Sequence, residues 1–394
     1  MTKSTKTRLG CEVLLANPPS WLRSGRLGLL AHQASVTSSF EHVGPLIARA
    51  GGKLSCLFSP QHGIHGVKQA NMIESDDDVD QTLDLPVFSL YGKTRQPSPE
   101  MLETLDILLI DLQDVGTRVY TYGTTMGLCL EQAAKVGIKV VVLDRPNPIN
   151  GEGMEGNILR EDHRSFVGRY PIPMRHGLTL GELARFIAGK MRIPCDLEVI
   201  PMEGWRRGDF HPDTDLPWVL PSPNMPSWET ALLYPGMVLL EGANVSEGRG
   251  TTLPFHLFGA PFIDQRKLLQ FLNECRLEGV IFRPVCFEPV FDKWKGETCY
   301  GFQSHITDWE KFRPYRLGLS LIQGLFRIHG EDFRWLPPPY EYEWEKLPID
   351  ILLGDGGLRE KLERGDDIEG LEASWQRELA EYRHAVEDCF LYRG

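Results

Sequence analysis

The chain has 394 residues, of which 42% are hydrophobic and 24% are charged, a size and composition typical of a globular protein with two domains. Its 42 Lys and Arg residues against 54 Asp and Glu residues leave a formal net charge of −12, which argues against nucleic acid or an anionic membrane as a partner. The first ten residues are partly basic but no apolar run follows them, and the apolar residues 27–31 are too few for a signal peptide or a membrane span. We therefore expect a cytoplasmic protein. Its eight cysteines form no CxxC pair, so we expect free thiols.

The first part of the chain alternates short apolar runs with stretches of helical periodicity. The predicted strands are residues 27–31, 53–58, 87–90, 107–111 and 139–143. The predicted helices between them are residues 39–49, 99–105 and 121–136. Alternation of this kind is typical of βαβ units, and it predicts a doubly wound α/β domain with a parallel sheet.

The organisation changes after about residue 156, where Gly and Pro become dense and strands are harder to identify. Helices are predicted at residues 180–191, 266–275, 315–330 and 371 to about 392, separated by long loops that in a compact domain are usually functional. An acidic aromatic run, residues 340–344, follows three consecutive prolines. We expect one domain over residues 1–156 and a second, of α/β or α+β type, over residues 157–394.

Polar loops follow the predicted strands, at the edge of a parallel sheet where ligands usually bind. Residues 59–63 read Ser-Pro-Gln-His-Gly, and residues 91–95 read Tyr-Gly-Lys-Thr-Arg. Residues 111–118 carry two aspartates and an arginine and are followed by Tyr120 and Tyr122. Such a set can position a sugar or a carboxylated substrate, although an Asp–Arg pair can also serve only to lock the loop. A metal site on His62 and His65 lacks partners at suitable spacing.

Common motifs for other chemistry are incomplete. Residues 151–156 fit GxGxxG but follow a proline-rich turn instead of a strand, which argues against a dinucleotide site. Residues 92–94 resemble the end of a P-loop, but Val87 stands where its first glycine belongs. The sequence has no HExxH, GxSxG or EF-hand motif.

Two polar stretches in the second part of the chain indicate a further part of the site. Residues 222–226 read Ser-Pro-Asn-Met-Pro, and residues 241–252 contain Ser-Glu-Gly-Arg-Gly-Thr. The second stretch is too polar and too rich in glycine for a core element, and its charges need partners or a ligand. We expect Glu247 or Arg249 to contact the substrate or to orient a residue that does.

Taken together, these segments resemble the DUF1343 family, which includes the exo-β-N-acetylmuramidases called NamZ. The segments that carry the resemblance, in the same order along almost the whole chain, are residues 57–63, 89–94, 111–122, 143–150, 175–182 and 241–254. The resemblance implies a glycoside hydrolase that releases terminal N-acetylmuramic acid from peptidoglycan fragments. It also implies a Rossmann-like N-terminal domain, a second domain, a substrate cleft between them, and no metal or nucleotide cofactor.

One difference from the family bears on catalysis. Many members have Ser-Pro-Glu-His-Gly, with that glutamate as the favoured catalytic group, whereas this chain has Gln61, and an amide can neither protonate a leaving oxygen nor act as a general base. The predicted catalytic residues are Glu74, ranked first because it follows this loop closely, with Asp114, Glu247 and His62. The predicted substrate-binding residues are Gln61, Tyr91, Lys93, Arg118, Tyr120, Tyr122, Asn224, Ser246, Arg249 and Thr251. Arg249 or Arg118 is expected to pair with the lactyl carboxylate of muramic acid.

Two other functions stay open at this point. One is a muramyl-sugar-binding protein that has lost catalysis at Gln61, and the other is a glycosidase for a different carboxylated sugar. The expected ligand in each case is a small molecule or an oligosaccharide. The oligomeric state does not follow from the sequence.

Overall fold

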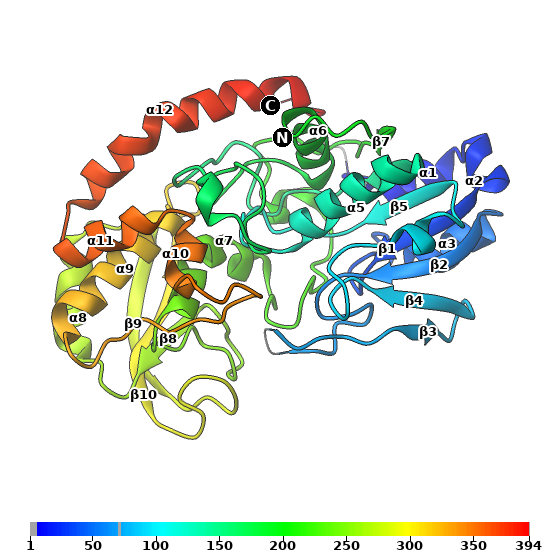
Figure 1. Ribbon diagram of the computed structural model, residues 1–394. Helices are drawn as coiled ribbons and strands as arrows, with labels where there is room; N and C mark the ends of the chain where they lie inside the picture. Colours follow the sequence, from blue (N-terminus) through cyan, green and yellow to red (C-terminus); the bar gives the residue numbers. More distant parts are fainter. Residues whose placement is uncertain (1–5, 70–71, 394) are drawn as a thin grey trace.

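The computed structural model describes residues 6–69 and 72–393, and its larger element is a seven-stranded sheet (Figure 1). Its strands lie in the order β3-β4-β2-β1-β5-β6-β7, and all neighbours are parallel except β3, which is antiparallel to β4. The bounds are β1 (Arg26–Ala31), β2 (Lys53–Ser59), β3 (Asp78–Asp80), β4 (Leu85–Ser89), β5 (Ile107–Asp111), β6 (Lys139–Leu143) and β7 (Leu197–Ile200). The predicted parallel α/β sheet is thus confirmed.

Helices cover both faces of this sheet. Because successive strand residues point to opposite sides, the apolar strands present an apolar surface on each face. On β5, Leu108 and Ile110 join the core beneath α4 (Pro99–Leu102), α5 (Tyr122–Val136) and α6 (Leu180–Lys190). Ile107 and Leu109 join the core on the other side, beneath α1 (Gly10–Ala16), α2 (Ser20–Ser24) and α3 (Val43–Arg49). The residues that make β5 a continuous apolar run therefore serve two separate cores, as expected for a buried parallel strand.

A smaller antiparallel sheet lies in the second part of the chain, in the order β8-β10-β9. Its strands are β8 (Leu257–Ala260), β9 (Val280–Phe287) and β10 (Cys299–Ile306), and the nearby helices are α7 (Trp228–Met237), α8 (Gln265–Glu274), α9 (Pro314–His329), α10 (Pro348–Leu353) and α11 (Gly356–Arg364). Phe258 and Phe302 bury one face of the sheet in the main core, whereas much of β9 is exposed. The second domain is thus of mixed α and β type, as predicted. The division at residue 156 stays a prediction, and β7 of the larger sheet lies beyond it.

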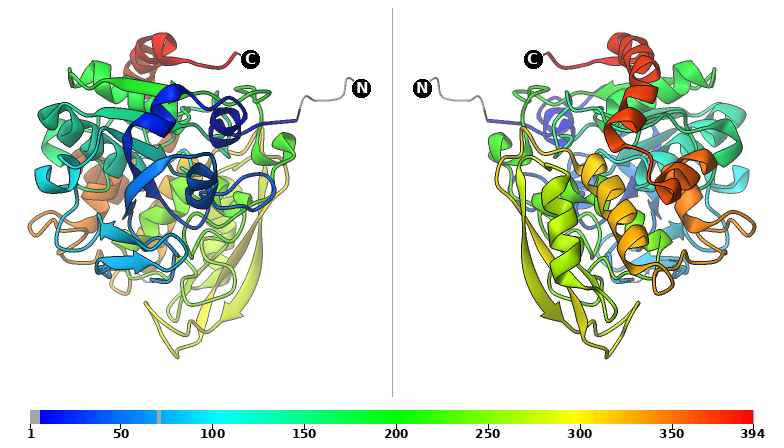
Figure 2. Two further views of the ribbon diagram at one scale, coloured as in Figure 1. Left: turned by 90° about the vertical axis from the view of Figure 1, so that its right-hand side faces the viewer. Right: turned by 90° about the vertical axis from the view of Figure 1, so that its left-hand side faces the viewer.

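The last long helix, α12 (Ile368–Val386), runs from α11 to α6, which packs on the larger sheet (Figures 1 and 2). Glu378 pairs with Arg160 at 2.8 Å, and the hydroxyl of Tyr382 donates to the carbonyl oxygen of His176 at 3.0 Å. The helix ends earlier than the predicted residue 392, and the chain beyond it brings the Tyr392 hydroxyl to 2.5 Å from Asp144 at the end of β6. The C-terminal segment therefore fastens the second domain to the larger sheet. Among the described residues, no helix is long and apolar enough to cross a membrane.

Candidate active site

The candidate site lies where loops from both domains meet at the carboxyl edge of the larger sheet. The chain passes from β1 to β2 and β4 on one side and to β5, β6 and β7 on the other, so the direction of strand addition reverses at β1. Ligands bind outside the strand ends at such a reversal. The loops after β2 and β5 line a cavity here together with loops of the second domain. Its polar and aromatic lining residues are Gln61, His62, Tyr120, Thr121, Tyr122, Ser222, Asn224, Tyr234, Glu241, Arg249, Phe255, Tyr340 and Glu341.

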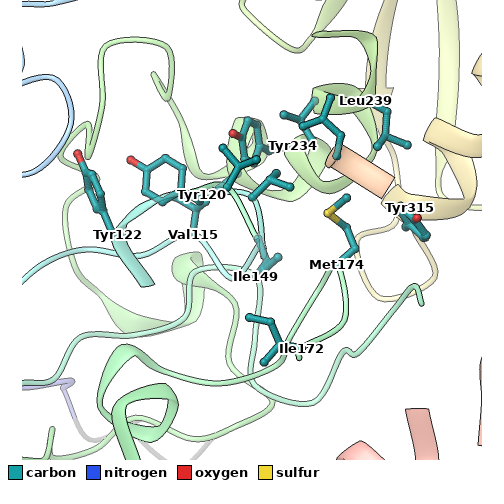
Figure 3. Close-up of a cluster of buried hydrophobic side chains, with 14 of the residues drawn as sticks. Val115, Tyr120, Tyr122, Ile149, Ile172, Met174, Tyr234, Leu239 and Tyr315 are labelled. Carbon is teal, nitrogen blue, oxygen red and sulfur yellow. The ribbon is translucent and has the colours of Figure 1, made fainter. Parts of the chain in front are cut away.

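Three tyrosine rings form one wall of this cavity at the margin of the main core (Figure 3). The ring centroids of Tyr120 and Tyr122 lie 4.7 Å apart, and those of Tyr120 and Tyr234 lie 6.0 Å apart, both in edge-to-face geometry. Tyr120 belongs to the loop after β5 and Tyr122 to the start of α5, whereas Tyr234 belongs to α7 of the second domain. The rings therefore join the two domains directly beside the cavity and offer apolar surface to a ligand.

A buried carboxyl group, Glu341, faces the amide of Gln61. The Gln61 Nε2 group donates to Glu341 Oε1 at 3.2 Å, and the Tyr91 hydroxyl donates to Glu341 Oε2 at 2.7 Å. The Thr121 hydroxyl donates to Gln61 Oε1 at 2.8 Å, which leaves the amide nitrogen directed at the carboxylate. Glu341 is only 3% exposed. Burial raises its pKa, and the nearby charge of Glu241 adds to this, against the hydrogen bonds from Tyr91 and Gln61.

A second carboxyl group, Glu241, belongs to a chain of charges on the opposite loop. Arg249 Nη2 pairs with Glu241 Oε1 at 2.8 Å, and Arg249 Nε lies 3.2 Å from Glu247 Oε1. Lys293 Nζ pairs with Glu247 Oε2 at 2.6 Å, and the Tyr340 hydroxyl donates to Glu241 Oε2 at 2.6 Å. Within residues 6–69 and 72–393, the Nη1 group of Arg249 has no hydrogen-bond partner. Arg249 thus lines the cavity, as does Glu241, while Glu247 lies behind Arg249 and holds it.

The Ser-Glu-Gly-Arg-Gly sequence places these charges because its glycines adopt left-handed backbone angles. Gly248 has a φ of 82°, and a Cβ there would lie 2.7 Å from the Leu257 carbonyl oxygen. Gly250 has a φ of 76°, and its Cβ would meet the Phe291 carbonyl oxygen at 2.4 Å. Only glycine fits at both positions. Ser246 accepts from the Gly248 amide at 3.1 Å and Thr251 donates to the Gly248 carbonyl at 2.5 Å, so both hydroxyls hold this loop.

His62 lines the cavity as a neutral imidazole. Burial lowers the pKa of His62 to about 4, in spite of a 2.6 Å contact between its Nδ1 and the Lys68 carbonyl oxygen. Because a carbonyl oxygen can only accept, the proton lies on Nδ1 and Nε2 remains an acceptor. His65 is exposed. In the described part of the chain, no three His, Cys, Asp or Glu side chains form a group that could hold a metal.

Glu74 does not line the cavity. Its half-exposed carboxylate pairs with Arg95 at 3.0 Å and accepts from the Tyr342 hydroxyl at 3.1 Å, and the contact with Arg95 chiefly lowers its pKa. The Arg95 guanidinium lies 3.7 Å from the centre of the Tyr342 ring. Glu74 therefore supports the outer side of the segment that carries Glu341.

Asp114 and Arg118 also lie outside the cavity lining. Asp114 accepts from the Gly116 amide at 2.7 Å and lies 3.2 Å from His176 Nε2. The buried Arg118 guanidinium donates to four carbonyl groups, those of Asn157, Ile172, Leu352 and Leu353. Both residues thus fix loops, and Arg118 joins the two domains.

The other predicted residues divide between cavity and surroundings. Asn224 lines the cavity and donates to the Gln69 carbonyl at 2.8 Å, and Tyr122 donates to the Pro221 carbonyl at 2.7 Å. Tyr91 acts on Glu341 from behind, and Lys93 is exposed. Glu341 was not predicted as a site residue, and Glu241 was predicted only as part of the stretch 241–252. The acidic aromatic run that contains Glu341 was the only signal for it.

The cavity continues toward a larger groove. Its own volume is about 30 Å³, room for one or two water molecules. Glu241 and Tyr340 also line a neighbouring groove of about 330 Å³, whose other members include Met72, Glu247 and Asp292. These two side chains therefore lie between the cavity and the groove.

The fold and site define a two-domain α/β protein whose interdomain cavity carries two buried carboxyl groups and an arginine. Residues 27–229 match the family model for the N-terminal part of the exo-beta-N-acetylmuramidase NamZ, and residues 232–392 match the model for its C-terminal part. The chain belongs to this family.

Comparisons with individual proteins agree with this assignment. The chain is 42% identical over 391 residues to the peptidoglycan beta-N-acetylmuramidase NamZ of Bacillus subtilis strain 168, a match that covers 99% of this chain and 92% of the relative. A crystal structure of a DUF1343 family protein from Bacteroides fragilis has a TM-score of 0.89 at 33% identity and covers 98% of this chain and 99% of its own. A second DUF1343 structure from the same organism has a TM-score of 0.78 at 27% identity and covers 99% of both chains.

Proposed function

We propose that this protein is a glycoside hydrolase of the exo-β-N-acetylmuramidase type, which releases terminal N-acetylmuramic acid from peptidoglycan fragments. Identity of 42% along 99% of the chain to a peptidoglycan beta-N-acetylmuramidase supports this substrate class. The observation that carries the proposal is the presence of two carboxyl groups, Glu241 and Glu341, in one cavity between the domains. Glycosidic bonds are commonly cleaved by such a pair, with water as the only co-reactant.

The lining residues can be given roles that follow from their contacts. Arg249 has its Nη1 group available for the lactyl carboxylate of muramic acid, and charged hydrogen bonds of this kind are strong. The rings of Tyr120, Tyr122 and Tyr234 offer a surface for the sugar ring. Glu241, held by Arg249 and Tyr340, is suited to stabilise positive charge at the anomeric carbon.

The remaining residues complete this assignment. Gln61, His62 and Asn224 line the cavity and contribute polar contacts to the sugar. Glu247 and Asp114 serve as positioning residues, because each holds a neighbouring group instead of facing the cavity. The expected cytoplasmic location stays a prediction, which fractionation of cells that produce the protein would test.

The test is release of a fluorescent aglycone from a β-N-acetylmuramic acid glycoside, with the matching β-N-acetylglucosaminide as control. The control lacks only the lactyl group. Since a hydrogen bond to a charged group contributes about 1.5–3 kcal/mol, we expect the muramide to be favoured by roughly 10- to 100-fold in kcat/KM.

Each other outcome identifies an alternative. Binding of the muramide by the folded protein without turnover would favour the sugar-binding protein. Turnover only on another carboxylated glycoside would favour a different substrate.

A further inference from the structure

The side chain that faces Gln61 comes from the other end of the chain. Glu341 lies 280 positions later in the sequence, and its carboxyl group contacts the Gln61 amide at 3.2 Å inside the cavity. We propose that Glu341 is the catalytic carboxyl group that protonates the glycosidic oxygen. It lies beside Gln61, whose amide cannot donate a proton in this way. This inference rests on the proposed glycosidase function.

The contacts of Glu341 leave it able to react. A carboxyl group has two oxygens with two lone-pair sites each. Gln61 occupies one site on Oε1 and Tyr91 occupies one on Oε2, so each oxygen keeps a further site for a substrate atom. Both donors are neutral, and neither forms an ion pair that would fix the carboxyl group in its charged form.

The segment around Glu341 is held in a conformation that directs this side chain into the cavity. Glu341 has a φ of 45°, in the left-handed region that non-glycine residues seldom adopt, and such angles persist only where the surroundings enforce them. The enforcing contacts lie on both sides: Tyr340 donates to Glu241, and the Tyr342 ring stacks on Arg95. The Glu341 amide also lies 3.3 Å from Met72 Sδ.

The electrostatic surroundings agree with a role as proton donor. Burial and the charge of Glu241 raise the pKa of Glu341, so its acid form persists to higher pH than that of an exposed glutamate. The other candidate carboxylates differ in this respect. Glu74 is half exposed with a lowered pKa, and Glu247 is paired with both Arg249 and Lys293.

The proposed step balances as follows. The protonated Glu341 gives its proton to the glycosidic oxygen while the bond between that oxygen and the anomeric carbon breaks. The bonding electron pair stays on the oxygen, and the aglycone leaves as an alcohol. A water molecule supplies the hydroxyl group of the released sugar, and the proton that this water loses restores the acid form of Glu341.

The experiment compares Glu341→Gln with wild type on two muramic acid glycosides. One carries N-acetylglucosamine as aglycone, which needs a proton to leave, and the other carries dinitrophenol, which does not. We expect a loss of about 10²- to 10⁴-fold in kcat on the first glycoside and a much smaller loss on the second. Glu345→Gln is the matched control, because it removes the same charge from an exposed position in the same segment and should leave both rates unchanged.

Other outcomes refute the inference in distinguishable ways. Equal losses on both glycosides would mean that Glu341 has a structural role only, and unchanged rates would exclude it altogether. An inactive but folded wild type would refute the proposed function together with this inference.

An exchange variant covers the case that Glu341→Gln does not fold. In Gln61→Glu/Glu341→Gln the amide and the carboxyl group swap places and keep their mutual hydrogen bond. If a carboxyl group acts in this part of the cavity, the exchange variant hydrolyses the N-acetylglucosamine glycoside at least about tenfold faster than Glu341→Gln. If Glu341→Gln does not fold, the expected result is measurable hydrolysis by the exchange variant. No gain in the folded exchange variant would contradict the inference.

Discussion

The hydrogen bond from Tyr91 to Glu341 allows the proposed acid to be tested without its removal. The Tyr91 hydroxyl is buried and donates to Glu341 Oε2 at 2.7 Å, an interaction that favours the charged carboxylate. Hydrogen bonds to charged groups contribute about 1.5–3 kcal/mol, and one pKa unit corresponds to about 1.4 kcal/mol. Tyr91→Phe should therefore raise the pKa of Glu341, because the charged carboxylate loses this donor. A water molecule that replaced the hydroxyl would make this rise in the pKa smaller.

The measurement is the pH dependence of kcat on the muramic acid–N-acetylglucosamine glycoside. If the acid form of Glu341 is the active one, activity falls as pH rises through its pKa, and in Tyr91→Phe this fall moves to higher pH. At a fixed pH on the falling limb, loss of about 1.5–3 kcal/mol of carboxylate stabilisation predicts a kcat roughly 10- to 100-fold above that of wild type. Tyr300→Phe is the control, because Tyr300 is exposed on β10 and does not line the cavity, and its profile should coincide with wild type. A basic limb that stays in place in Tyr91→Phe, or moves to lower pH, would refute the assignment of the proton to Glu341.

Three further substitutions test the structural roles of residues around the site. Burial raises the pKa of Asp144 from 3.8 to about 7, so the free energy of unfolding should fall by about 4 kcal/mol as pH rises through this interval. In denaturant titrations at several pH values, Asp144→Asn should show a smaller fall. An equally steep fall in the variant would contradict this. Glu74→Gln should keep the kcat and the unfolding midpoint of wild type, since Glu74 is a surface partner of Arg95, and a large loss of kcat would return it to the catalytic candidates. Arg118→Met leaves four buried carbonyl groups without their donor and should lower the free energy of unfolding by about 3 kcal/mol or more. An unchanged free energy of unfolding together with a raised KM would instead indicate a substrate contact.

The larger sheet could be predicted because its strands carry their signal locally. Residues 107–111 are apolar at every position except the last, since both faces of β5 are buried, and the loop and helix that follow identify a βαβ unit. The smaller sheet gives no such signal. Residues 280–287 have only one buried position, and they include Arg283 and Pro284, which argue against a central strand. β7 has four half-buried residues and no continuous apolar run, so it was missed for a similar reason.

The site residues that could be predicted are likewise those that follow strands of the larger sheet. Gln61, His62, Tyr120 and Tyr122 were predicted as site residues because carboxyl ends of parallel strands share one edge of the sheet, and the structure brings them to one cavity. Glu341 could not be found by this rule, because no strand of the larger sheet leads to it. Its position depends on packing of residues 340–342 between Glu241 and Arg95, which are remote from it in sequence.

The amide at position 61 and the carboxyl group at position 341 depend on each other. Two carboxylates at the 3.2 Å separation of Gln61 and Glu341 would repel, and one of them would have to stay protonated. With glutamine at position 61, the amide instead donates to Glu341 and helps to orient it, while Thr121 keeps the amide from turning. Proton transfer to a glycosidic oxygen depends on where the carboxyl group lies in the cavity and not on which segment of the chain supplies it. Gln61 is therefore compatible with hydrolysis in this protein as the partner that positions the acid.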